Sequence, residues 1–134
     1  MNMEAIRRPT VSTFEGSDAF AGVPEIADIH FDLWVLRIAL SFRDIDDTVH
    51  VSFEGVRGFR VLDEGDLLEF WEPDARASGW LWRVKDGGWF ALESTRQGFV
   101  SGITDCYKEY LVVGVNDCVS VISTNEPKIE APKP

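Results

Sequence analysis

Asp44 and Asp46 are the residues whose type and spacing come closest to a catalytic pair. They follow an apolar stretch and lie two positions apart, so in an extended chain both side chains point the same way. Carboxylate oxygens are the ligands that a hard cation such as Mg²⁺ prefers. The structural alternative is a polar turn that joins two antiparallel strands.

The segment Asp44-Ile45-Asp46-Asp47-Thr48-Val49 resembles the first motif of the haloacid dehalogenase superfamily of phosphatases. The resemblance implies that Asp44 is the nucleophile, that Asp46 is the acid and base, and that Mg²⁺ lies between them. It also implies a parallel sheet with a lysine and a second acidic pair on later strands. Here Lys85 falls in a predicted tight hairpin, and Gly114 is followed by Val115-Asn116, without the expected acidic residue. We therefore favour the polar turn, and a metal-dependent phosphatase-like hydrolase is an alternative.

The two histidines give weaker signals. His30 lies between Asp28 and Asp32, and residues two apart on a strand share a face, so these three could hold a metal ion. A solvated strand end explains them better, because the set is a poor match to any one metal. His50 has no evident nucleophile partner, and no serine stands in a glycine-flanked elbow. The sequence predicts no catalytic residue, no metal site and no cofactor.

The charge of the chain is strongly negative and unevenly distributed. There are 23 acidic and 13 basic residues, for a net charge of −10, and residues 28–74 hold 12 of the acids and 4 of the bases. Nucleic acids and anionic membranes are therefore excluded as ligands, because both need clustered Lys and Arg. An acidic surface fits a basic protein partner, or it keeps the protein soluble. The candidate partner-binding residues are Asp44, Asp46, Asp47, Glu54, Asp63, Glu64, Asp66, Glu69 and Glu72.

Five tryptophans in 134 residues are a high proportion. If exposed, Trp80, Trp82 and Trp89 could line a pocket for a small ligand, which is a further functional alternative. The structural explanation is that large aromatics fill the core of a small β-rich domain. The two cysteines, Cys106 and Cys118, have neither metal nor catalytic spacing, and we expect two buried thiols.

The chain is organised around the stretch from Thr48 to Pro73. Residues 49–53 alternate apolar and polar side chains, which predicts a strand with one buried face. Glycines in 55–58 predict a tight turn, and 59–61 resume the alternation as the antiparallel partner. From Asp63 the period changes to that of an amphipathic helix over about residues 63–72, capped by Asp63 and ended by Pro73. A helix this short must lie on a sheet.

The same reasoning assigns the other elements. Residues 29–42 read as one long strand, with a helix as the rival interpretation. The remaining predictions are a short strand at 10–14, a hairpin of 80–85 with 89–94 that turns at Asp86-Gly87-Gly88, and a hairpin of 107–115 with 118–123 that turns at Asn116-Asp117. Because strands and helices do not alternate, a doubly wound parallel fold is excluded. We predict an α+β fold: a mainly antiparallel, curved sheet built from hairpins, with the helix of residues 63–72 packed on it.

The predicted domain organisation is simple. Residues 1–28 form an N-terminal arm, 29–124 a single α+β domain, and 125–134 a flexible, proline-rich tail. The N-terminus lacks the apolar run of a signal peptide, and no segment approaches the roughly 20 apolar residues of a membrane helix. We expect a cytoplasmic protein.

A further resemblance concerns the middle of the chain. Its components are Phe53-Glu54-Gly55-Val56, Phe59-Arg60, Asp63-Glu64, an acidic helix that ends in Trp71, and a late apolar hairpin. Together they resemble small bacterial proteins that are encoded beside polymorphic toxins, some of which are immunity proteins. The resemblance implies a cytoplasmic antitoxin that blocks a toxin domain by direct binding. Many such targets are basic nucleases, which suits an acidic binding surface.

Overall fold

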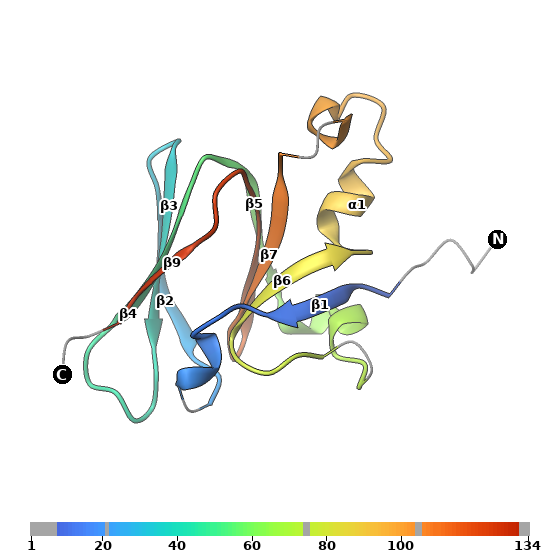
Figure 1. The fold of residues 1–134 in the computed structure, drawn as a ribbon. Helices are drawn as coiled ribbons and strands as arrows, with labels where there is room; N and C mark the ends of the chain where they lie inside the picture. Colours follow the sequence, from blue (N-terminus) through green and yellow to red (C-terminus); the bar gives the residue numbers. More distant parts are fainter. Residues whose placement is uncertain (1–7, 21, 74–75, 104–105, 132–134) are drawn as a thin grey trace.

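A computed structural model describes residues 8–20, 22–73, 76–103 and 106–131. Within these ranges the chain forms two antiparallel sheets (Figure 1). The five-stranded sheet has the order β1-β6-β7-β8-β5, and the four-stranded sheet has the order β2-β3-β4-β9. The strands are β1 (Thr10–Thr13), β2 (Glu25–Phe31), β3 (Val35–Ser41), β4 (Val49–Glu54), β5 (Val56–Asp63), β6 (Leu81–Asp86), β7 (Lys108–Val113), β8 (Asp117–Ser123) and β9 (Lys128–Glu130).

The main core lies between the two sheets. The four-stranded sheet contributes alternate residues such as Leu36, Ile38 and Val51, and the five-stranded sheet contributes Tyr110 and Val119 among others. This alternation is the expected pattern of strands with one buried face. The two sheets therefore pack face to face around a shared apolar layer.

The outer face of the five-stranded sheet carries a second apolar cluster. Trp82, Leu111 and Cys118 of the sheet pack there against Leu67 and Phe70. The covering segment consists of two consecutive 3₁₀ turns, η3 (Glu64–Asp66) and η4 (Leu68–Phe70).

The structure thus differs from the predicted continuous helix over 63–72. Leu67, between the turns, has φ −129° and ψ 36°, which interrupts a helix. A 3₁₀ helix has three residues per turn, so Leu67 and Phe70 stand one above the other and both reach the sheet. Gly65 is a weak helix former, which disfavours an α-helix here.

The predicted long strand over 29–42 is wrong, because the chain reverses within it. β2 and β3 are an antiparallel pair, with Phe31 opposite Leu36. Leu33 has a positive φ of 79°, and Asp32 accepts hydrogen bonds from the N–H groups of Trp34 (3.0 Å) and Val35 (2.7 Å). The sequence has no glycine at this turn, so the usual signal of a hairpin is missing.

Strands β4 and β5 do not form the predicted hairpin either. β4 pairs with β3 and β9, whereas β5 pairs with β8. Gly55, at φ +68°, is the corner at which the chain passes from one sheet to the other, and a side chain there would collide with Thr124. Thr124 follows β8, at the corner where the chain returns to the four-stranded sheet, and its N–H donates to the Gly55 carbonyl (3.1 Å).

The connection between β6 and β7 holds the helix α1 (Trp89–Glu93) and the 3₁₀ turn η5 (Val100–Ile103). The predicted hairpin of 80–85 with 89–94 is therefore wrong in its second strand. The partner of β6 is β7, with Trp82 opposite Leu111. In Figure 1, α1 lies beside the five-stranded sheet, on the side away from the four-stranded sheet.

Several predictions are confirmed. The described residues form mainly antiparallel sheet, the strand near residues 10–14 exists as β1, and β7 and β8 form the late hairpin. The short helix α1 is not at the predicted position, 63–72. The prediction of a flexible tail over 125–134 is not among the confirmed ones, because β9 within that range pairs with β4, with Ile129 opposite Val51. Among the described residues, no helix has the length and apolar character needed to cross a membrane.

Candidate functional site

A group of exposed acids surrounds the turns η3 and η4. We define the acidic patch as Asp63, Glu64, Asp66, Glu69 and Glu72 together with Asp117 at the start of β8. All six side chains are exposed. Asp63 and Asp117 are opposite one another in the β5–β8 pair, and the Glu64 N–H donates to the Asn116 carbonyl (2.8 Å). Residues from two separate strands thus bring their charges to one surface.

The patch is held on a well-packed support. The Asp63 carboxylate accepts the Gly65 N–H (2.8 Å) and caps η3, as expected of an Asp at this position. The Trp71 indole N–H donates to the Glu64 carbonyl (2.7 Å). Leu67 and Phe70 are buried beneath the turns. The backbone that carries the acids is therefore fixed at both ends and from below.

An apolar side chain lies within the acidic patch. Leu68 is 67% exposed and precedes Glu69, whose charge acts on the half-buried guanidinium of Arg60. Arg76 lies over the Trp71 ring, 5.6 Å from its centroid. Acids thus outnumber cations here, and an exposed leucine among them is a suitable contact for a partner with mixed basic and apolar character.

The other predicted partner-binding acids lie elsewhere. Asp44, Asp46 and Asp47 are exposed in the loop between β3 and β4, which belongs to the four-stranded sheet (Figure 1). Glu54 is at the far end of β4 from that loop, about 16–20 Å away at the usual rise per residue. The nine acids therefore lie in three places: five around η3 and η4, three in the β3–β4 loop, and Glu54 by itself.

Asp44 and Asp46 do not have the surroundings that the phosphatase motif requires. Both follow β3, which is antiparallel to β2 and β4, and both are exposed. In the ranges that the structure describes, no three side chains among His, Cys, Asp and Glu are grouped closely enough to hold a metal ion. The polar turn is the interpretation that the geometry favours.

The tryptophans proposed for a pocket have different locations. Trp80 is buried in the core between the sheets, and Trp82 is buried in the outer cluster. Trp89 is half-buried, with the Arg60 guanidinium 5.2 Å from the centroid of its ring. These three rings therefore do not line one common pocket. Of the two cysteines expected in the core, Cys118 is buried but Cys106 is exposed.

Glu109 is a notable residue that the sequence analysis missed. It lies on β7 and is only 2% exposed. Its two carboxylate oxygens accept the N–H groups of Trp89 (3.0 Å) and Phe90 (2.7 Å) at the start of α1. Desolvation raises its pKa, while these two hydrogen bonds and the charges of Arg60 and Arg83 oppose the rise. The sequence did hold one signal that Glu109 is buried: in an apolar strand, it shares a face with Leu111 and Val113.

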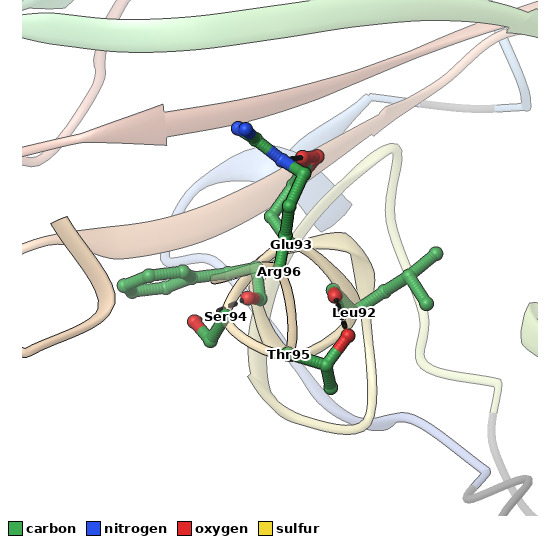
Figure 2. Close-up of polar contacts among 6 residues, drawn as sticks. Leu92, Glu93, Ser94, Thr95 and Arg96 are labelled. Atoms are coloured by element: carbon green, nitrogen blue, oxygen red, sulfur yellow. Dashed lines mark hydrogen bonds and ion pairs between the residues drawn. The ribbon is translucent and has the colours of Figure 1, made fainter. Parts of the chain in front are cut away.

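A cavity of about 280 Å³ opens beside Glu109. Its lining includes Phe90 of α1, Lys85 of β6 and Tyr107. Figure 2 shows the end of α1 and the turn after it, where Thr95 donates to the Leu92 carbonyl (2.7 Å) and Leu92 points away from Glu93 and Arg96. The volume is at the lower limit for small-molecule sites. Because both oxygens of Glu109 already bind the helix backbone, the carboxylate is a structural cap in this arrangement.

Comparisons of the chain with protein-family models, with curated proteins and with solved structures give no match.

Proposed function

We propose that this protein is a non-enzymatic binding module that recognises a basic protein. By the resemblance given above, the partner is a toxin domain, and the protein neutralises it as a cytoplasmic immunity protein. The observation that carries the proposal is the acidic patch: six exposed carboxylates around η3 and η4, on a support fixed by packing and caps.

The physical basis of recognition is charge complementarity. Acids gathered on one rigid surface attract a basic partner during diffusion and align it before contact. Since the Debye length is about 8 Å at physiological ionic strength, only closely grouped charges act together. The η3–η4 group meets this condition better than acids scattered over the molecule. Leu68, exposed in the middle of the acids, adds an apolar contact.

The alternatives have less support from the geometry. A phosphatase-like mechanism needs Asp44 and Asp46 beside a lysine at the end of a parallel strand, and both lie in a loop of an antiparallel sheet. A tryptophan-lined pocket needs neighbouring exposed rings, and Trp80 and Trp82 belong to two separate buried clusters.

The test is capture of partners from the source cell with a purified, tagged protein. We predict that a basic protein is retained by the natural sequence and lost when Glu69→Lys and Glu72→Lys are combined, because the patch then carries two cations in place of two anions. The matched control combines Glu15→Lys and Glu126→Lys, two exposed acids outside the patch, which change the net charge by the same amount.

The control variant should retain the same basic protein. Co-expression of the natural sequence with the captured protein should relieve the toxicity of the captured protein. If the patch variant and the control variant capture it equally well, the patch is not the binding surface. If the captured proteins are acidic, the electrostatic basis of the proposal is wrong.

A further inference from the structure

The turn between β2 and β3 presents two large apolar side chains to solvent. Leu33 is 84% exposed and Trp34 is 60% exposed. They are adjacent in sequence, and their turn projects beyond the strands next to the β4–β5 corner (Figure 1). We call Leu33 and Trp34 the apolar tip. A single exposed apolar residue is common on protein surfaces, whereas an exposed Trp beside an exposed Leu is the composition of a binding hot spot.

The backbone of the apolar tip is in an unfavourable conformation. In the part of the chain that the structure describes, Leu33 is the one residue other than glycine with a positive φ, at 79°. Left-handed backbone costs a residue with a side chain roughly 1–2 kcal/mol, and glycine is the usual residue at the first central position of such a two-residue loop. Leucine at position 33 therefore costs stability in comparison with glycine. Its presence is explained better if the side chain contacts a binding partner.

The apolar tip is nevertheless held rigidly. One Asp32 carboxylate oxygen accepts the N–H groups of Trp34 and Val35, and the Asp32 N–H donates to the Val35 carbonyl (3.2 Å). The hydrogen bonds from Val35 and Trp34 lower the pKa of Asp32, so the carboxylate stays ionised at neutral pH. A turn fixed in this way loses little conformational entropy when a partner binds.

The surroundings of the apolar tip are anionic. Asp32 lies in the turn itself, and Glu54 lies opposite Val35 in the β3–β4 pair. Asp28 and Glu25 lie further along β2, with Glu25 at its opposite end. The next cation along β3, Arg37, is paired with Glu130 at 3.2 Å. An anionic lipid surface would be repelled, whereas a pocket on a protein with basic residues around its rim would be attracted.

We propose that the apolar tip inserts into an apolar pocket with a basic rim on a protein partner. This second contact surface goes beyond the acidic patch. The tip adjoins the end of β4, next to where β5 begins, whereas the patch starts where β5 ends. β5 has eight residues, so the two surfaces are about 25 Å apart along the strand. The inference shares with the proposed function only the premise of a protein partner.

The test begins with a photo-reactive amino acid at position 34. The full chain is expressed in the source cell, irradiated, and the cross-linked protein is identified by mass spectrometry and purified. Its dissociation constant is then measured for the natural sequence, Leu33→Gly, Trp34→Ala and the control Val61→Ala, which alters another exposed apolar residue. We expect binding at least tenfold weaker for the two tip variants and unchanged for Val61→Ala.

The variant Leu33→Gly separates recognition from folding. Glycine relieves the unfavourable φ, so this variant should unfold at the same temperature as the natural protein or a higher one while it binds less tightly. A cross-link only to lipid, only to another copy of the chain, or to nothing would overturn the proposal. Equal affinities for all variants would also overturn it.

The patch variant with Glu69→Lys and Glu72→Lys is measured with the same purified partner. If it loses binding while the tip variants retain it, the apolar tip is excluded and the acidic patch stands. If only the tip variants lose binding, the apolar tip stands and the proposed role of the patch is wrong.

Discussion

At the scale of single residues, Glu109 connects the β6–β7 segment to the sheet. Each of its oxygens takes one N–H from the start of α1, and such charge-assisted bonds are stronger than neutral ones. Arg60 and Arg83 compensate its charge from β5 and β6. The contact between Glu109 and α1 could not be predicted from the sequence, because the residue that caps α1 comes 20 positions after Trp89. Residues 89–94 therefore look like a strand when they are considered without it.

We predict that Glu109→Ala destabilises the protein by about 2–4 kcal/mol. The substitution leaves the two part-buried N–H groups of Trp89 and Phe90 without an acceptor and removes the anion near Arg60 and Arg83. Each such loss costs about 1–3 kcal/mol. Urea unfolding followed by tryptophan fluorescence measures the change. Glu126→Ala, at an exposed position, is the control and should change stability by less than about 0.5 kcal/mol. Equal effects of the two substitutions would contradict the capping role.

The raised pKa of Glu109 gives a pH-dependent prediction. The native state binds the proton of the Glu109 carboxyl more tightly than the unfolded chain does, in which the pKa has its ordinary value of 4.5. The contribution of Glu109 to stability is therefore full below about pH 4.5, falls as pH rises through the native pKa, and is constant above that.

Glu109→Gln removes this titration and leaves the other groups in place. The difference in unfolding temperature, natural protein minus variant, should decrease over that pH range and then level off. Thermal unfolding between pH 4 and 8 measures it. A difference that grows with pH would show that the native pKa is lowered instead.

At the scale of elements, the sequence predicted those whose signals are local. The alternation in β4 marks a strand that buries one face, and β6 was found in the same way. The β7–β8 hairpin was found as two apolar runs, because both faces of these strands are buried. Asp63 was correctly identified as a cap, although the segment after it forms two 3₁₀ turns. The β2–β3 turn was missed because its carboxylate cap replaces the glycine that usually marks such a turn. These errors occur where a side chain, not a backbone propensity, determines the conformation.

Gly88 provides a test of how α1 begins. A Cβ at this position would lie 2.8 Å from the Glu109 oxygens and 2.6 Å from the Val84 Cγ1, so the chain can approach the carboxylate this closely only without a side chain. We predict that Gly88→Ala destabilises the protein by about 1–3 kcal/mol through overpacking.

Gly98→Ala is the matched control, because the nearest atom to its Cβ is the flexible Arg96 guanidinium at 3.6 Å. Alanine there should leave the unfolding temperature unchanged or raise it slightly. If Gly88→Ala is as stable as Gly98→Ala, the close approach of α1 to Glu109 is not needed.

At the scale of the whole molecule, period and composition correctly predicted antiparallel sheet but not how many sheets there are. Whether two successive strands share a sheet depends on a corner such as Gly55, where the opposing Thr124 is 69 positions away. The concentration of acids in residues 28–74 was visible in the sequence. Their division among three places was not, because the order along the chain does not state which ends of the strands lie together.

The most direct test of the proposed function is the association rate of the captured basic partner, measured by stopped flow at two ionic strengths. We predict that the rate constant falls by tenfold or more when Glu69→Lys and Glu72→Lys are combined, and falls when salt is raised for the natural protein. The Glu15→Lys and Glu126→Lys control should keep a rate near the natural one. A rate that is the same for all three proteins and insensitive to salt would contradict electrostatic recognition through the acidic patch.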